Sequence, residues 1–111
     1  MFCRAYACLR AAGEESKSPV FRSTYAGRAI HEVLSVLGVR GGSLTRRIDL
    51  ACERGLLSNH AAVDARALSV DANVRLDVEH GFSTPDPVAS RRLFEFADWL
   101  VADASCVQKS L

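Results

Sequence analysis

The chain has 111 residues, of which 49% are hydrophobic and 24% are charged, and its net charge is +1. This length fits one domain with a single hydrophobic core. The nearly balanced charge excludes a global field that would hold nucleic acid or an anionic membrane. Because the chain has no apolar run long enough to cross a bilayer and no signal peptide, we expect a cytoplasmic protein without a membrane partner.

The charges are divided unevenly along the chain. Up to Leu57 there are 9 Lys and Arg residues against 5 Asp and Glu residues, and from Ser58 onward there are 5 against 8. Either the two halves pack together and neutralise each other, or the first half carries a positive surface.

Apolar residues recur at intervals of three and four throughout, which predicts an all-α protein, a compact helical bundle of about five helices. The first helix is expected over 2–12, with Phe2, Tyr6 and Leu9 on its inner side and Gly13 at its end. This helix and its linker form a segment over 1–17, and the bundle domain covers 18–107.

Capping residues mark the second and third helices. Ser18 as cap and Pro19 at the first position predict a helix to about residue 36 or 37. Its core stripe consists of Ile30, Val33, Leu34 and Leu37. Ser43 is expected to cap a third helix that ends at Gly55. That helix is amphipathic, with Leu44, Ile48 and Ala51 inside and Arg46, Arg47 and Arg54 outside.

The fourth helix is expected to run from Ser58 or Asn59 to about His80, and Gly81 ends it. Its buried line comprises Val63, Ala67, Val70, Val74 and Val78. Asp86 and Pro87 begin the last helix, which buries Leu93, Phe96, Ala97, Leu100, Val101 and Ala104. Phe94 and Trp99 lie off this stripe, so they either broaden the core or form a dimer interface.

Metal and cofactor motifs are missing from the sequence. The cysteines Cys3, Cys8, Cys52 and Cys106 lack the paired spacing of zinc ligands, so we expect reduced thiols that are buried as small hydrophobic residues. His31 and Glu32 begin an HExxH pattern, but Ser35 stands where the second histidine is needed. We therefore expect no metal and no cofactor.

A polar stripe on the fourth helix is the main candidate site. Arg66, Ser69, Asn73, Asp77 and His80 step by three or four residues and share one helix face. His80 lies at the C-terminal end, where the helix dipole favours its charged form, and Asp77 one turn earlier is placed to orient its ring. Arg75 lies roughly 140° round the helix from His80, so the two converge only between two copies of the chain. Alternatively, Arg75 pairs with Asp71 or Glu79 and His80 simply ends a helix.

The order of several segments resembles a bacterial family of the HEPN-like class, found alone or attached to restriction and other defence proteins. The matching segments are STYAGRAIHEVL at 23–34, LTRRIDL at 44–50, GLL at 55–57 and the polar helix that ends in His80. The similarity covers about 18–104.

The resemblance implies a helical bundle that is often a homodimer, and in several members a metal-independent ribonuclease with an Arg-x4-6-His motif. Carried over, Arg75 would bind phosphate and His80 would be the catalytic histidine, with Asp77 beside it. Leu76 replaces the polar residue that commonly follows the arginine. This departure favours a degenerate member kept for binding.

Three functions therefore stay open. The leading hypothesis is a HEPN-like module, homodimeric, that binds a protein or RNA partner in a prokaryotic or phage defence-related process. The first alternative is a metal-independent ribonuclease with a composite site of Arg75 and His80 across the dimer. The second is a nucleotide-binding sensor that uses Arg46, Arg47 and Arg54. Asn73 and Arg66 are further candidate ligand-binding residues.

Overall fold

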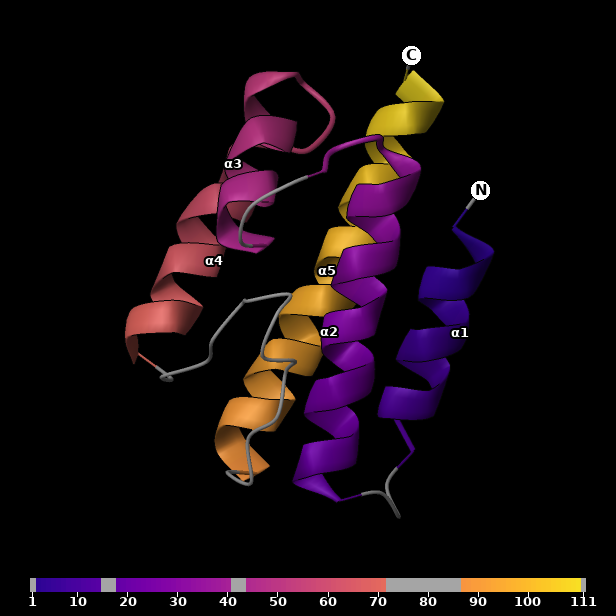
Figure 1. Ribbon diagram of the computed structural model, residues 1–111, viewed down its shortest axis with the longest axis vertical. Helices are drawn as coiled ribbons and strands as arrows, with labels where there is room; N and C mark the ends of the chain where they lie inside the picture. Colours follow the sequence, from indigo (N-terminus) through magenta and orange to yellow (C-terminus); the bar gives the residue numbers. More distant parts are fainter. Residues whose placement is uncertain (1, 15–17, 41–43, 72–86, 111) are drawn as a thin grey trace.

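The computed structural model describes residues 2–14, 18–40, 44–71 and 87–110. These residues form five α-helices and no strand (Figure 1). The helices are α1 (Cys3–Ala12), α2 (Pro19–Val36), α3 (Leu44–Glu53), α4 (His60–Asp71) and α5 (Pro87–Ser110). The predicted all-α bundle is confirmed for the described part of the chain.

Helix α2 lies at the centre of the bundle. It packs most extensively against α1 on one side and α5 on the other, and it also contacts α3 (Figure 1). Helices α3 and α4 pack against each other, and α4 also contacts α5. The bundle therefore consists of a three-helix layer of α1, α2 and α5 with the α3–α4 pair beside it.

Local signals explain where α2 begins and where α2 and α3 end. The Ser18 hydroxyl accepts a hydrogen bond of 3.2 Å from the backbone N–H of Phe21, and Pro19 occupies the first helical position, as predicted. Gly38 and Gly55 have φ angles of +78° and +73° and reverse the chain after α2 and α3. The next N–H groups, from Val39 and Leu56, then bond back into the last turn of each helix.

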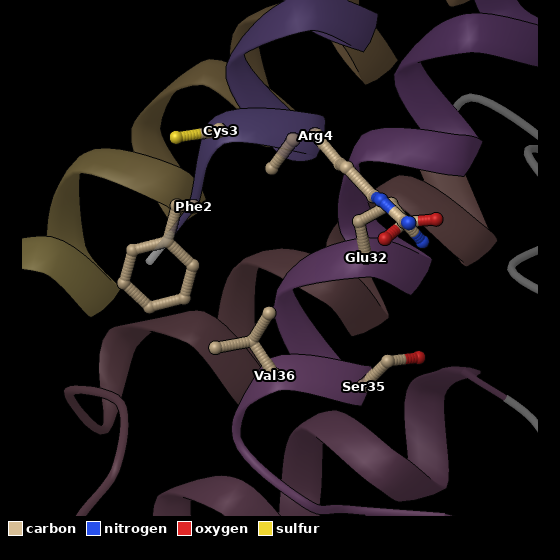
Figure 2. A pocket seen from close by; sticks show the side chains of 7 residues that line it. Phe2, Cys3, Arg4, Glu32, Ser35 and Val36 are labelled. Atoms are coloured by element: carbon tan, nitrogen blue, oxygen red, sulfur yellow. The ribbon is translucent and has the colours of Figure 1, made fainter.

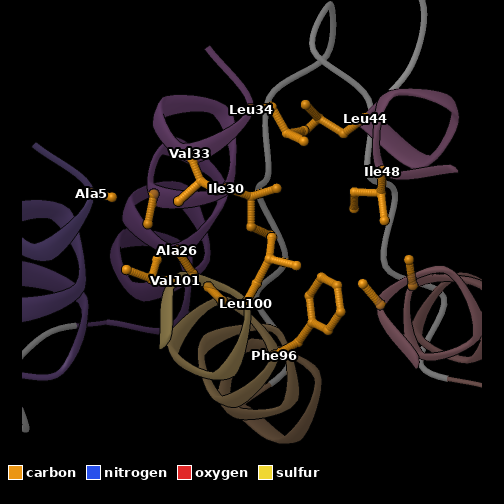
Figure 3. Close-up of a cluster of buried hydrophobic side chains, with 14 of the residues drawn as sticks. Ala5, Ala26, Ile30, Val33, Leu34, Leu44, Ile48, Phe96, Leu100 and Val101 are labelled. Carbon is orange, nitrogen blue, oxygen red and sulfur yellow. The ribbon is translucent and has the colours of Figure 1, made fainter. Parts of the chain in front are cut away.

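The core joins residues from all five helices (Figure 3). Ile30, Val33 and Leu34 of α2 are fully buried, whereas Leu37 just after the helix is partly buried against the same cluster. The other predicted stripes are buried as well, namely Leu44, Ile48 and Ala51 of α3 and Leu93, Phe96, Ala97, Leu100, Val101 and Ala104 of α5. Phe94 and Trp99 are partly buried and broaden this core.

The predicted inner side of α1 is wrong at one position. Tyr6 is 44% exposed, and its hydroxyl lies 3.4 Å from Ser105 Oγ at the surface. The side that faces α2 and α5 carries Phe2, Ala5, Leu9 and Ala12. The alanines allow α1 to approach its neighbours closely, whereas a buried tyrosine would need space and a partner for its hydroxyl.

The predicted buried line of α4 is wrong at Val63. Val63 is 62% exposed and Ala67 is partly buried, whereas Ala61, Ala65 and Leu68 lie in the core. Helix α4 has two apolar faces, and the face with two alanines lets its backbone approach α3 and α5 more closely. The side chain of Val70, together with Val74 and Val78, lies outside the described residues, as do the predicted caps Ser43 and Asp86 and the predicted helix beyond Asp71.

The expectation of four buried cysteines is wrong for two of them. Cys3 and Cys106 are exposed, because they lie on the outer faces of α1 and α5. Cys8 and Cys52 are partly buried, and burial is the main reason that the pKa of each thiol is raised. Nearby acidic groups raise these pKa values further, so both partly buried groups stay protonated thiols at neutral pH.

Candidate functional site

Most of the predicted polar stripe lies outside the described residues. This applies to Asn73, Asp77 and His80, and to the side chain of Ser69. Arg75, which is not part of the stripe, lies outside the described residues as well. The composite site of Arg75 and His80 therefore stays a prediction.

Arg66 is the one member of the stripe whose side chain the structure describes. Its guanidinium is largely exposed, and Nη2 lies 3.3 Å from Oδ2 of Asp49 on α3. The second carboxylate oxygen of Asp49 is buried and has no hydrogen-bond partner among the described residues. Because an exposed pair of this kind contributes less than about 1 kcal/mol, Arg66 retains the freedom to bind another anion.

The two candidate arginines of α3 lie in different environments. Arg46 is exposed, whereas Arg47 is only 3% exposed, so the prediction that Arg47 lies outside is wrong. Nε of Arg47 donates a hydrogen bond of 2.9 Å to the carbonyl of Val39, and Nη1 lies 3.1 Å from Nδ1 of His31. Arg47 thus connects α3 to the C-terminal part of α2 instead of facing solvent beside Arg46.

The environment of Arg47 assigns a role to His31. Burial lowers the pKa of Arg47, and the neighbouring Arg40 cation lowers it further. Arg47 has only N–H donors, so Nδ1 of His31 accepts the hydrogen bond, which assigns the tautomer with its proton on Nε2. The sequence contains a signal for this burial, because Arg47 falls at i+3 on the stripe of Leu44, Ile48 and Ala51.

A second polar cluster attaches the turn between α3 and α4 to α5. The backbone N–H of Ser58 donates a hydrogen bond of 2.9 Å to Oδ2 of Asp103, and the Cys52 thiol donates one of 3.3 Å to the carbonyl of Ser58. These contacts give hydrogen-bond partners to the partly buried N–H and carbonyl groups of Ser58, so their role is structural.

A groove between α4 and α5 is a surface feature that suits the binding of another protein. Its volume is about 280 Å³, and it is lined by Asp64, Ala67, Leu68, Arg92, Glu95, Phe96 and Trp99. Leu68 and Phe96 are buried, and the rings of Phe96 and Trp99 lie 6.3 Å apart. Trp99 is partly buried, so it presents an aromatic surface at the edge of the groove.

Charges of both signs surround the apolar part of the groove. Asp64 comes from α4, whereas Arg92 and Glu95 come from α5. The exposed Val63 lies one turn before Ala67 and extends the apolar surface of α4. An aromatic and aliphatic centre with a charged rim is the anatomy of a protein-binding surface. The sequence pattern indicated Trp99 as a candidate interface residue but gave no signal for its neighbours from α4, which are about 30 residues away in the chain.

Other classes of site find little support in the described part of the chain. In these residues no group of three or more His, Cys, Asp or Glu side chains is placed to hold a metal ion. None of the described helices is both long and apolar enough to span a membrane. Comparisons with protein-family models, curated proteins and solved structures found no match to this chain.

Proposed function

We propose that the protein is a small HEPN-like helical module that binds a macromolecular partner in a prokaryotic or phage defence-related process in the cytoplasm. The order of its segments between residues 23 and 57 supports the family, because the resemblance spans helices α2 and α3. The observation that carries a binding function is the α4/α5 groove, in which Trp99 stands beside a charged rim.

The partner that fits this groove best is a second copy of the chain. In a two-fold dimer each surface must complement itself, so a patch needs both members of each ion pair. The groove offers Asp64 and Glu95 as anions and Arg92 as a cation, and its charges are therefore complementary to those of a second groove. Val63 and Trp99 provide the apolar contacts of such an interface.

We expect the wild-type chain to sediment as a dimer and Val63→Asp to dissociate it. An aspartate at this position would place a desolvated charge in the interface, so we expect the dimer dissociation constant to rise at least about 30-fold, equivalent to about 2 kcal/mol. Sedimentation equilibrium between about 1 and 100 μM measures this constant, a range that covers micromolar dimers.

The matched control is Val20→Asp, which introduces the same residue at an exposed valine of α2 away from the groove. We expect this control to dimerise like the wild type. A wild-type chain that stays monomeric over the whole range would exclude the dimer, and equal weakening by both variants would place the interface elsewhere.

The module is proposed to bind its macromolecular partner and not to act as a ribonuclease. Leu76 supports this choice, because an apolar side chain follows Arg75 where a polar helper is expected. We expect RNA to remain intact after incubation with the dimer in the presence of a metal chelator, as followed on a denaturing gel. Cleavage that leaves a cyclic phosphate and disappears in His80→Ala would establish the ribonuclease function instead.

A further inference from the structure

A second pocket lies between the N-terminal end of α1 and the C-terminal end of α2 (Figure 2). Its volume is about 410 Å³, and it is lined by Phe2, Cys3, Arg4, Ala5, Glu32, Ser35 and Val36. This volume lies within the range of about 300–1,000 Å³ that small-molecule sites occupy. The pocket lies on other helices than the α4/α5 groove, so it is independent of the proposed interface.

The pocket carries one cation and one anion, on different helices. Arg4 comes from α1 and Glu32 from α2, and Figure 2 shows their charged ends on the same side of the cavity. A ligand with a single negative charge would be attracted by Arg4 but repelled by Glu32. A ligand with a single positive charge would be attracted by Glu32 but repelled by Arg4. The pair therefore favours a ligand that carries both charges.

Apolar side chains occupy another part of the pocket. Figure 2 shows the Phe2 ring and the Val36 side chain across the cavity from the Arg4 guanidinium. Phe2 is already buried in the core, whereas Val36 is 43% exposed. A ligand with an aliphatic group would cover Val36 and gain from removing that surface from water.

We propose that this pocket binds a small zwitterion with an aliphatic side chain, of the α-amino-acid type. Its carboxylate pairs with the Arg4 guanidinium, which offers several N–H donors in one plane. Its ammonium pairs with the Glu32 carboxylate, and its side chain lies against Phe2 and Val36. Ser35 supplies a hydroxyl next to Glu32 for a further hydrogen bond.

The position of Cys3 allows a direct test on the intact chain. Cys3 lines the pocket and is exposed, and Cys106 is an exposed cysteine outside it. The raised pKa values of Cys8 and Cys52 keep these two thiols slow to react, so alkylation by iodoacetamide reports mainly on the exposed pair. Peptide mapping by mass spectrometry gives the rate at each cysteine.

With about 20 mM L-leucine as the probe, we expect alkylation of Cys3 to slow at least about threefold while that of Cys106 stays constant, as for a site of millimolar affinity. N-acetyl-L-leucine lacks the ammonium charge and L-leucinamide lacks the carboxylate. Neither compound is expected to protect Cys3.

Arg4→Gln and Glu32→Gln each remove one charge of the pocket and keep a polar side chain of similar size. Arg4 is exposed and Glu32 is partly buried. Circular dichroism verifies that each variant stays folded. We expect both variants to lose the protection by L-leucine. An unchanged Cys3 rate in the wild type, equal protection by N-acetyl-L-leucine, or full protection in either variant would overturn the proposal.

Discussion

Replacement of Leu100 by alanine is expected to lower the free energy of unfolding by about 3 kcal/mol. Leu100 is fully buried on α5, at the centre of the cluster that also contains Ile30 and Phe96 (Figure 3). Removing its isobutyl group loses apolar contacts and leaves a cavity that the surrounding helices fill only in part. Because domains of this size have a total stability of about 5–15 kcal/mol, the loss is a large fraction of the whole.

Thermal unfolding followed by circular dichroism measures this effect, and we expect Tm to fall by about 12 °C, at about 4 °C per kcal/mol. The matched control is Val88→Ala on the same helix, because Val88 is 68% exposed. That change should alter stability by no more than about 0.5 kcal/mol. Equal destabilisation by the two variants would contradict the burial of Leu100.

Replacement of His31 by leucine is expected to lower the free energy of unfolding by about 2 kcal/mol, with a fall in Tm of about 8 °C. The buried Arg47 donates to Nδ1 of His31 at 3.1 Å, and leucine offers no acceptor at that place. A guanidinium that loses a hydrogen-bond partner away from water incurs the desolvation cost of that group.

The matched variant is His31→Asn, whose amide oxygen stands at the same distance along the side chain as Nδ1. We expect it to retain most of the stability, within about 1 kcal/mol of the wild type. Helix propensity alone predicts the opposite order, since leucine is the better helix former by a few tenths of a kcal/mol. A His31→Leu variant as stable as His31→Asn would therefore exclude the hydrogen bond as the cause.

The helices α2 and α5 could be predicted well because their signals are local. Ser18 and Pro19 set the start of α2, and each helix has one apolar stripe with fully buried side chains, among them Ile30, Val33 and Leu34 in α2 and Leu93, Leu100 and Val101 in α5. Where a helix has one apolar face, burial of that face follows from the hydrophobic effect without knowledge of the neighbours.

Helix α4 differs because it has two apolar faces. The sequence pattern favoured the face that carries Val63, but the residues of α4 that lie in the core are Ala61, Ala65 and Leu68. Which face is buried depends on how closely α3 and α5 approach, and that distance is a property of the packed bundle. The exposed Val63 is the direct consequence of this choice.

The burial of Arg47 also depends on contacts between different parts of the chain. Treating arginine as a surface residue placed Arg47 outside, although its position on the apolar stripe of α3 indicated burial. Its burial is tolerated only because Val39 and His31, from other parts of the chain, supply acceptors. A pattern within one helix contains no information about such partners.

The order of apolar and capping residues thus determined by itself that this chain forms a helical bundle, and it determined the inner faces of α2 and α5, because those properties depend on residues within one helix. Only the tertiary structure decided the inner face of α4, the burial of Arg47, the groove around Trp99 and the pocket between Arg4 and Glu32. Each of these brings together side chains from different helices, so it exists only after the helices have packed.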